Sequence, residues 1–429
     1  MKGIHGKIHR LIISRQVVGK KSSFLKHKDN ITKVTLITIM IAITFVILCG
    51  CGIVGNHRKN GDSNNVGNKG NKKEELQQEK DRSKQVILEP VVDLVQEKLD
   101  AMTLEEKIGQ LFIVGFNGCE ANEEISHMIK DRHVGGVIFF SENIDTVVQT
   151  KGLIENLNSL NSKNPLKLFI SLDEEGGIVS RIPKEMGSFE SAWDVGARGD
   201  LDYSFNHGRL IGETVKSLGF NLDFAPVLDV NSNSDNPVIG IRAFSDDPQV
   251  VKVMGTEVFK GIRSAGVIAV GKHFPGHGDT DVDSHVAVPV INKSIDELKN
   301  IELIPFKYAI DNGIDMIMVG HLYLPQLDDK YVSSLSKKII TGILRQELGF
   351  NGVVITDDMI MEGVKRTYTT RESAVKAIEA GNDIIIVSRA FKDQEEAIDG
   401  LLEAVKSGVI SEKRIDESVY RIINLKKNI

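Results

Sequence analysis

The stretch VIAVGKHFPGHGDTDVDSH, residues 267–285, joins an apolar run to a loop that is crowded with ionisable side chains. Residues 267–271 are typical of a strand buried in a core, since none of them is polar. The loop contains the Pro and Gly that a turn requires, but it also holds three His and three Asp, which a turn does not require. Functional side chains concentrate on loops that a rigid scaffold holds in place. The stretch therefore predicts a strand whose carboxyl end carries a functional loop, and the alternative is a polar surface loop.

Similar apolar runs recur along the chain. The strand candidates are residues 110–116, 136–140, 167–172, 222–227, 267–270, 316–319, 353–355 and 384–387. Between them lie amphipathic stretches at residues 144–160, 204–218, 248–264, 296–311, 336–347 and 371–380. Apolar runs without alternation are typical of parallel strands covered on both faces. They predict an α/β fold, a (β/α)8 TIM-type barrel in a single domain, with a doubly wound sheet as the alternative. The barrel is favoured because polar clusters follow strand after strand, as they do in barrel active sites.

Composition and charge exclude some classes of protein. The chain is 41% hydrophobic and 26% charged, which is ordinary for a globular protein with a sizeable core. Residues 1–50 hold nine Lys or Arg and one acid, so the rest of the chain is strongly acidic although the net charge is only −6. An acidic body argues against nucleic-acid binding, which rests on basic contacts to phosphate. The three cysteines, Cys49, Cys51 and Cys119, are too few for a disulfide framework.

The N-terminal region is typical of an exported, membrane-anchored protein. Basic residues precede the apolar run at residues 34–49, which is the layout of an export signal. The run ends in Leu48-Cys49-Gly50-Cys51, which resembles a bacterial lipobox with Cys51 as the lipidated residue. The long basic leader allows two other interpretations, a later start codon or an uncleaved membrane anchor.

Three segments are therefore predicted. Residues 1–52 are a signal or anchor, residues 53–86 are a flexible polar tether, and residues 87–429 are the folded barrel. Thr103 and Glu106 have the spacing of a capping box that opens a helix near the start of this barrel.

Polar residues follow the predicted strands at one end of each. They are Asp173-Glu174-Glu175-Gly176-Gly177 and Arg181 after the third strand, Asp223, Asp229 and Arg242 after the fourth, Lys272 and His273 after the fifth, His321 after the sixth, and Asp357-Asp358 after the seventh. These side chains are expected to converge at one face. Zinc binding by His273, His277 and His285 is one interpretation, but no His-x-x-x-His pair supports it. Carbohydrate cleavage fits better, since it needs a nucleophile or base and a proton donor around the scissile bond.

Two motifs carry a resemblance to a known family. Residues 344–359, LRQELGFNGVVITDDM, resemble the signature of glycoside hydrolase family 3, in which a Ser/Thr-Asp at a strand end supplies the nucleophile. Residues 272–285, KHFPGHGDTDVDSH, resemble the β-N-acetylhexosaminidase branch of that family, which an Asp-Ser-His marks. The resemblance covers about residues 95–425. It implies a (β/α)8 barrel, and the second domain of the β-glucosidase members is not expected because the chain ends near Leu425.

The resemblance implies catalytic roles for three residues. Asp357 would be the nucleophile, His285 the acid/base, and Asp283 the carboxylate that fixes the tautomer of His285. A histidine suits proton transfer because its ordinary pKa is about 6.5. Asp358 would point to the opposite side if the strand continues, although parity alone does not choose between the two Asp. The alternative for Asp283 and His285 is a pair that stabilises a turn.

The resemblance also implies substrate contacts at Asp173, Arg181, Arg242, Lys272 and His273. A carboxylate accepts from sugar hydroxyls, while the cations donate to hydroxyl and N-acetyl oxygens. For the two Arg, the alternative is a structural ion pair. The sequence departs from the family at Ile178, where an Arg is common. The remaining polar residues are predicted to shape the loop (His277, Asp279 and Asp281) or to line the pocket or cap a strand (His321).

The predicted function is that of an exo-acting, retaining β-N-acetylglucosaminidase, which would hydrolyse terminal β-linked GlcNAc from cell-wall or chitin-type fragments through a covalent glycosyl-enzyme. The alternatives are a β-N-acetylglucosaminide phosphorylase and a non-catalytic surface protein that binds cell-wall sugars. The expected partners are a carbohydrate substrate and, through the N-terminal anchor, a membrane. No nucleic acid, cofactor or metal is expected. The protein is predicted to be a monomer on the extracytoplasmic face of the cell membrane.

Overall fold

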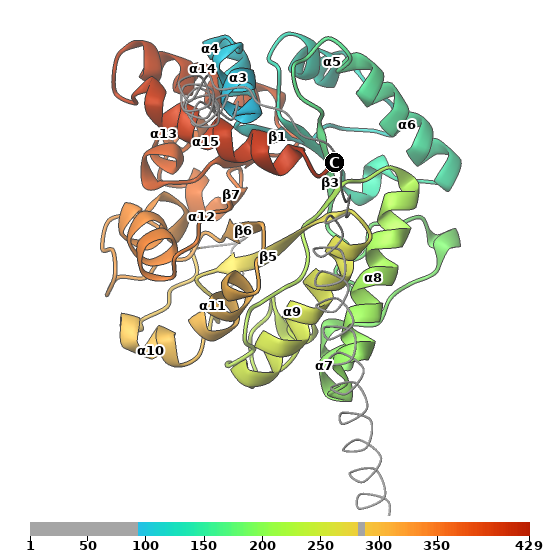
Figure 1. Ribbon diagram of the computed structural model, residues 1–429. Helices are drawn as coiled ribbons and strands as arrows, with labels where there is room; N and C mark the ends of the chain where they lie inside the picture. Colours follow the sequence, from blue (N-terminus) through green and yellow to red (C-terminus); the bar gives the residue numbers. More distant parts are fainter. Residues whose placement is uncertain (1–92, 282–287) are drawn as a thin grey trace, which may run out of the picture. The chain divides into compact units, whose positions relative to one another are not determined.

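The computed structural model describes residues 93–281 and 288–429, which form a closed barrel of parallel strands (Figure 1). Each strand pairs with its neighbours in chain order, and the first pairs with the last. The strands are β1 (Phe112–Val114), β2 (Gly136–Ile138), β3 (Phe169–Leu172), β4 (Leu222–Asp223), β5 (Ile268–Phe274), β6 (Met316–Val319), β7 (Val353–Asp358) and β8 (Ile384–Val387). The predicted (β/α)8 barrel is confirmed, and the doubly wound alternative is wrong.

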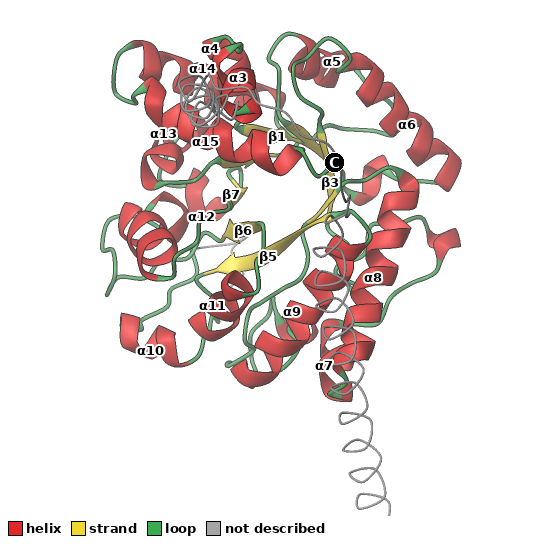
Figure 2. Cartoon of the chain, in the orientation of Figure 1, coloured by secondary structure: helices red, strands yellow, loops and turns green. Residues whose placement is uncertain are grey.

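Helices surround the barrel on the outside (Figure 2). They are α3 (Leu94–Asp100), α4 (Leu104–Gly109), α5 (Glu123–Lys130), α6 (Val147–Leu160), α7 (Ala192–Arg198), α8 (Leu201–Leu218), α9 (Pro248–Ser264), α10 (Ile295–Asn300), α11 (Leu303–Asp311), the π-helix η5 (Lys338–Glu347), α12 (Glu362–Lys365), α13 (Thr370–Ala380), α14 (Phe391–Lys406) and α15 (Glu412–Lys426). Short 3-10 turns are η1 (Ser141–Asn143), η2 (Lys184–Met186), η3 (Gly240–Arg242) and η4 (Ser333–Leu335). The predicted capping box is confirmed, because Thr103 and Glu106 satisfy each other's backbone N–H groups at the start of α4.

The predicted helix at residues 296–311 is wrong in one respect, because the structure divides it into α10 and α11. The chain leaves helical geometry at Ile301. The next residue, Glu302, is fully buried and accepts a hydrogen bond from Lys293 at 2.6 Å. The break thus turns an acidic side chain inward to a partner instead of outward to solvent.

Two strands are irregular at the ends that approach the candidate site. The pairing register of β5 with β6 shifts between Gly271 and Phe274, and that of β7 with β8 shifts between Ile355 and Asp358. A bulge of this kind inserts a residue into one strand and re-aims the side chains beside it. Both irregularities therefore fall where the sequence predicted functional residues.

A buried lysine closes the other end of the barrel. The Lys426 Nζ, on α15, donates to Gln110 Oε1 at 2.8 Å and to the carbonyl oxygens of Gly135 at 2.7 Å and Lys167 at 2.6 Å. It also lies 4.5 Å from the ring centre of Phe169. The amine of Lys426 therefore has three oxygen acceptors within hydrogen-bond distance, and burial lowers its pKa well below the ordinary value of a lysine. This end holds the starts of the strands, where barrel residues serve stability.

Several predictions fall outside the described residues. These are the apolar run at 34–49, the lipidation site Cys51, the tether at 53–86, the start of the folded body at 87, and the pair Asp283 and His285. Among residues 93–281 and 288–429, no helix is both long enough and apolar enough to cross a membrane.

Candidate active site

A pocket of about 530 Å³ opens at the carboxyl ends of the barrel strands. Its wall includes the predicted residues Asp173, Arg181, Arg242, Lys272, His273 and Asp357, together with Phe140, Glu175, Phe224, His277, Asp358, Met361 and Arg389. A second hollow of about 640 Å³ is lined by none of the predicted site residues. The pocket at the strand ends is therefore the one that the sequence predicted.

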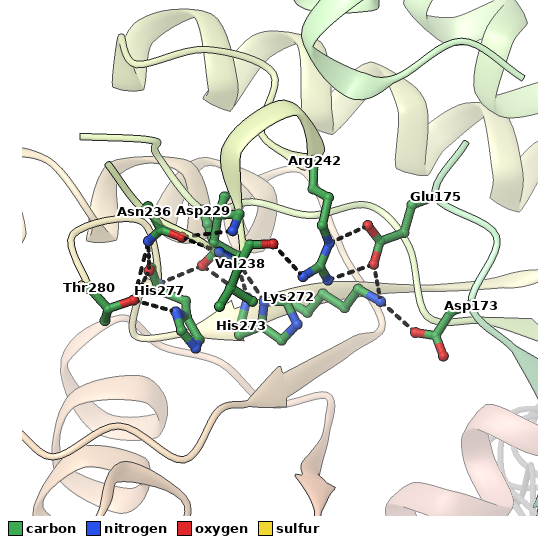
Figure 3. Close-up of polar contacts among 11 residues, drawn as sticks. Asp173, Glu175, Asp229, Asn236, Val238, Arg242, Lys272, His273, His277 and Thr280 are labelled. Atoms are coloured by element: carbon green, nitrogen blue, oxygen red, sulfur yellow. Dashed lines mark hydrogen bonds and ion pairs between the residues drawn. The ribbon is translucent and has the colours of Figure 1, made fainter. Parts of the chain in front are cut away.

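Two acids and two bases form one side of this pocket (Figure 3). The Lys272 Nζ contacts Asp173 Oδ1 at 2.6 Å and Glu175 Oε1 at 2.7 Å. Arg242 donates through Nε and Nη2 to the two oxygens of Glu175, both at 2.8 Å. Arg242 also donates from Nη1 to the Val238 carbonyl at 3.1 Å. The four side chains form one alternating network of opposite charges, which we call the charge cluster.

Three members of the charge cluster, Glu175, Arg242 and Lys272, are ionised because neighbouring opposite charges offset the cost of their burial. Burial alone would raise the pKa of Glu175, but Lys272 and Arg242 hold it well below its ordinary value. Burial alone would lower the pKa of the two bases, and the carboxylates beside them raise both values instead. Arg242 thus forms an ion pair with Glu175, and the same side chain also lines the pocket.

A second network fixes the histidines. Asp229 is fully buried and accepts from the backbone N–H groups of His273 at 3.1 Å and His277 at 2.7 Å. Its other oxygen lies 2.7 Å from His273 Nδ1, so His273 donates from Nδ1 to this carboxylate (Figure 3). Burial opposes the ionisation of Asp229, but His273 and these N–H donors lower its pKa. His273 therefore presents its other nitrogen, Nε2, away from Asp229.

The loop after β5 begins as the sequence predicted, with polar residues that fix its path. His277 Nδ1 lies 2.9 Å from Thr280 Oγ1, and Asn236 Nδ2 donates to the His277 carbonyl at 2.9 Å. A side chain at Gly278 would place its Cβ 1.6 Å from the Val230 carbonyl oxygen, so only glycine permits this close approach. Asp279 pairs with Lys293 at 2.8 Å. The catalytic candidates Asp283 and His285 lie beyond this point, outside the described residues.

Both acids at the end of β7 line the pocket. The expectation that Asp358 points to the side opposite Asp357 assumed a regular strand, and the register shift between Ile355 and Asp358 interrupts that regularity. The Asp358 N–H donates to Asp357 Oδ1 at 2.8 Å. Asp358 Oδ1 accepts from Ser388 N at 3.0 Å, which directs this carboxylate toward β8.

The two adjacent acids differ in pKa. Burial raises the pKa of Asp357, but His321, His273 and the Asp358 N–H outweigh it, and the net result is a lowered value. Burial and the charge of Asp357 raise the pKa of Asp358 to about 6. Environments that separate two neighbouring carboxyl groups in this way are typical of sites with acid/base chemistry. Asp357 is thus the acid that stays a carboxylate.

His321, which was predicted to line the pocket or to cap a strand, contacts the backbone at the end of β7. It is 1% exposed, its Nδ1 lies 2.7 Å from Ser334 Oγ, and its Nε2 lies 3.0 Å from the Asp358 carbonyl oxygen. A carbonyl only accepts, so Nε2 carries a proton. His321 is not among the residues that line the pocket, and it holds the backbone carbonyl of Asp358 in place.

The sequence indicated Glu175 and Asp229 but did not predict their contacts. Glu175 binds Lys272 and Arg242, and Asp229 binds His273. Both belong to the quoted polar clusters, so residue type after a strand was a signal for them. Arg181 lines the pocket as predicted, and among the described residues it forms no ion pair. Ile178, the departure from the family pattern, is 69% exposed. No group of three or more His, Cys, Asp or Glu in the described part of the chain could hold a metal ion.

Comparison with known proteins agrees with this geometry. Residues 103–425 match the model of the Glycosyl hydrolase family 3 N terminal domain. The chain belongs to glycoside hydrolase family 3. Among the family 3 relatives, it is 35% identical over 331 residues to Beta-hexosaminidase A of Pseudoalteromonas piscicida, covering 71% of this chain and 55% of that protein. It is 34% identical over 296 residues to Beta-hexosaminidase of Methylobacillus flagellatus, covering 67% and 82% of the two chains.

Solved structures of family 3 proteins share the fold. A glycoside hydrolase family 3 beta-N-acetylglucosaminidase from Paenibacillus sp. str. FPU-7 aligns with a TM-score of 0.75 and 42% identity, covering 76% of this chain and 63% of that one. The Beta-N-acetylhexosaminidase from Beutenbergia cavernae aligns with a TM-score of 0.71 and 28% identity, covering 76% and 99%. The chain thus spans little more than half the length of the Pseudoalteromonas relative and almost all of the Beutenbergia structure.

Proposed function

We propose that this family 3 member is an exo-acting, retaining β-N-acetylglucosaminidase. The observation that carries the proposal is that Asp357 and the charge cluster line one pocket of about 530 Å³. This volume lies within the range of pockets that enclose small ligands. An ionised carboxylate beside a dense set of hydrogen-bond donors and acceptors is what the cleavage of a glycosidic bond requires.

The charge cluster suits a neutral, hydroxyl-rich ligand. Its two acids and two bases sum to zero, so the wall offers directed hydrogen bonds without a net charge. Lys272 commits two of its three N–H groups to Asp173 and Glu175, which leaves one for a hydroxyl. Asp173 is only partly buried, and one of its oxygens remains to accept from a sugar hydroxyl. In the neutral ring His273 Nε2 is an acceptor, because Nδ1 holds the proton.

The lowered pKa of Asp357 keeps it ionised near neutrality, as a nucleophile requires. In the proposed first step, one oxygen of Asp357 bonds to the anomeric carbon while the bond to the leaving group breaks. The departing oxygen takes a proton from His285. In the second step a water gives a proton to His285 and attacks the anomeric carbon, which releases Asp357 and restores the β configuration. The roles of His285 and Asp283 rest on the sequence motif.

The names of the relatives support an N-acetyl sugar. Two of the compared proteins are named Beta-hexosaminidase, and the Paenibacillus structure is that of a beta-N-acetylglucosaminidase. We propose terminal GlcNAc on cell-wall fragments such as GlcNAc-MurNAc as the substrate, with chitin-type fragments as the competing source. A competition assay with equal concentrations of the two fragments measures the ratio of their kcat/KM values. A higher kcat/KM for the chitin-type fragment would contradict the proposal that cell-wall fragments are the substrate.

The test of the activity uses the full chain, purified in detergent. We expect release of nitrophenol from the β-N-acetylglucosaminide and not from the β-glucoside, with the β anomer of GlcNAc as the first product in a proton NMR time course. Phosphate-dependent formation of sugar 1-phosphate would instead indicate a phosphorylase. A folded protein that turns over neither substrate would indicate a sugar-binding protein.

Two amide variants identify the nucleophile, since they differ only in position. Asp357→Asn is expected to lose about a thousandfold or more in kcat, because no covalent intermediate forms. Asp358→Asn is the matched control and is expected to lose less than about tenfold, since its carboxylate bonds to β8. Equal losses in the two variants, or the larger loss in Asp358→Asn, would contradict the assignment.

We also propose an extracytoplasmic, membrane-anchored location, which rests on the apolar run at 34–49 and on Cys51. Membrane fractions of a bacterium that expresses the full chain should contain the activity, and labelled fatty acid should enter the protein but not a Cys51→Ala variant. Membrane association without labelling would leave the uncleaved anchor as the explanation. Activity in the soluble cell fraction would contradict both.

A further inference from the structure

Arg389, the second residue after β8, lines the pocket and has no role in the proposed chemistry. Its guanidinium carbon lies 4.4 Å from the ring centre of Phe140, which follows β2 and lines the same pocket. Its Nη1 contacts Glu142 Oε2, on η1, at 2.8 Å. A cation above an aromatic face is attracted by the ring, and the planar guanidinium stacks well there. We call these three residues the arginine stack.

The backbone that carries Arg389 is fixed to the rest of the site. The N–H of Ser388 donates to Asp358 Oδ1 at 3.0 Å, so the acid next to the proposed nucleophile holds the residue before Arg389. From α14, Gln394 Nε2 donates to the carbonyl oxygens of Ser388 and Gly115, the latter at 2.8 Å. A side chain on a backbone that is already held loses less freedom when it binds a ligand, which favours affinity.

Arg389 retains most of its hydrogen-bonding capacity. A guanidinium has five N–H donors, and among the described residues Glu142 is the one hydrogen-bonding or ion-pair partner of Arg389. Glu142 is not among the residues that line the pocket, so the cation and not the carboxylate borders it. The guanidinium fork matches the two oxygens of a carboxylate, which it binds through two parallel hydrogen bonds. The arginine stack therefore offers a receptor for a carboxylate.

Neither the terminal sugar of the proposed substrate nor the fold requires this cation. GlcNAc is neutral, and the charge cluster already offers it donors and acceptors on the pocket wall. The side chains of Arg389 and Glu142 are 39% and 42% exposed, and an ion pair with this exposure contributes little to stability. A cation on the wall of a sugar pocket instead fits a substrate that carries an acidic group.

The place of Arg389 in the barrel is on the side of the leaving group. In the proposed reaction the terminal sugar lies between the charge cluster and Asp357, with its anomeric carbon at Asp357. The charge cluster comes from β5 and the segments after β3 and β4, whereas Arg389 follows β8, which pairs with the strand of Asp357. A group attached to the anomeric carbon therefore begins at the end of the sugar that faces away from the charge cluster, beside the part of the wall that Arg389 forms.

We propose that Arg389 determines specificity for a leaving group that carries a carboxylate, and that Phe140 and Glu142 hold its guanidinium in position to bind that group. The inference rests on the proposed function, because a leaving group exists only if the protein cleaves a glycosidic bond. It also gives a physical cause for the proposed preference for cell-wall fragments. The MurNAc of GlcNAc-MurNAc bears a lactyl carboxylate, whereas the second sugar of a chitin-type fragment bears none.

The test compares two substrates that differ in one charge. The full chain, purified in detergent, is assayed with GlcNAc-MurNAc and with its lactyl methyl ester, which has the same sugars and the same scissile bond. Wild type should hydrolyse the acid with a kcat/KM about tenfold or more above that of the ester. Arg389→Gln should lower kcat/KM for the acid by a similar factor and change that for the ester by less than about threefold. Arg389→Lys should keep part of the preference, because it retains the charge and loses the fork.

Arg198 supplies a matched control elsewhere in the chain. Its guanidinium carbon also lies 4.4 Å from a ring centre, that of Tyr203, and it pairs with Glu190 at a similar exposure. Arg198 is not among the residues that line the pocket. Arg198→Gln should leave kcat/KM for both substrates within about threefold of wild type. The Tm of this variant and of Arg389→Gln should stay within about 3 °C of wild type.

Two kinetic results would overturn the proposal. Equal losses for the acid and the ester in Arg389→Gln would mean that Arg389 acts on the terminal sugar or on the fold. A wild type that does not distinguish the acid from the ester would exclude a carboxylate site without any variant.

A binding measurement separates this proposal from the proposed function. If wild type hydrolyses neither substrate, the proposed function fails, and calorimetry with free MurNAc decides whether Arg389 binds the carboxylate. A Kd that is about tenfold weaker in Arg389→Gln than in wild type would support the site. Equal or undetectable binding in the two proteins would overturn it.

Discussion

Replacing Glu175 by Gln is the perturbation whose result the charge cluster determines most directly. The Glu175 Oε1 accepts from Lys272 at 2.7 Å and from Arg242 Nη2 at 2.8 Å, while Oε2 accepts from Arg242 Nε at 2.8 Å. A glutamine side chain has nearly the same shape, but it has no charge and only one acceptor oxygen. Its N–H₂ group would face at least one donor of the two cations, so the variant loses a charge-assisted bond and gains a donor–donor contact.

The cost follows from burial, since the Glu175 side chain is only 3% exposed. Removing one partner of a buried ion pair costs about 3–5 kcal/mol. Glutamine keeps one acceptor, so we expect a loss of about 2–3 kcal/mol in the free energy of unfolding. Lys272 and Arg242 would also turn toward Asp173. Their N–H groups would then occupy the Asp173 oxygen that is proposed to accept from a sugar hydroxyl. If the same 2–3 kcal/mol is lost in transition-state binding, kcat/KM falls by roughly a hundredfold.

The assay is steady-state kinetics on the aryl N-acetylglucosaminide, together with denaturant unfolding. Glu362→Gln is the matched control, because Glu362 lines the same pocket but pairs with Arg366 near the surface, where an ion pair contributes little. The control should stay within about threefold of wild type in kcat/KM. A folded Glu175→Gln protein with kcat/KM equally close to wild type would refute the argument that Glu175 arranges Lys272 and Arg242 for substrate.

Three further changes have defined outcomes. Arg181→Lys should raise KM by about tenfold without loss of Tm, because Arg181 has no ion pair to lose among the described residues; an unchanged KM would contradict its contact with substrate. Wild type should lose stability as pH rises through about 6, because folding raises the pKa of the Asp358 carboxyl group to that value. Asp358→Asn lacks this group, so its free energy of unfolding should rise relative to that of wild type by at most about 3 kcal/mol over the same pH range. An equal difference between the two proteins at pH 4.5 and at pH 7.5 would contradict this. Lys426→Met should lower the free energy of unfolding by about 3 kcal/mol, since three buried acceptors lose their donor, while kcat per folded molecule stays the same; lost kcat in folded protein would contradict its purely structural role.

The strands were predictable because a parallel strand covered on both faces leaves an uninterrupted apolar run. Residues 316–319 and 384–387 coincide with β6 and β8. The prediction stopped short at β5 and β7, where Lys272, His273, Asp357 and Asp358 are polar and still belong to the strands. A search for apolar runs does not detect a strand residue that is polar because its side chain faces a pocket. The same cause shortened the prediction at both functional strands.

The residue types of the site were predictable, but their pairing was not. Asp173 and Lys272 are 99 residues apart in the chain, Glu175 and Arg242 are 67 apart, and Asp229 and His273 are 44 apart. A linear pattern shows which residues follow strands, whereas the choice of partners depends on strand tilt and loop path. For this reason Glu175 and Asp229 were visible as acids and not as the groups that hold the cations and histidines.

The register shift in β5 makes the length of the chain, as well as the identity of its residues, part of what specifies the pocket. Lys272 and His273 are consecutive, yet both line the pocket, which a regular strand with alternating faces does not permit. A regularly paired strand in place of this irregular one would restore the alternation and turn one of the two side chains away from the pocket. No substitution elsewhere would bring it back. An engineer who wishes to graft this pocket onto another barrel must therefore transfer the irregular backbone of β5 as a unit, because copying side chains onto a regular strand would deliver half of the pair.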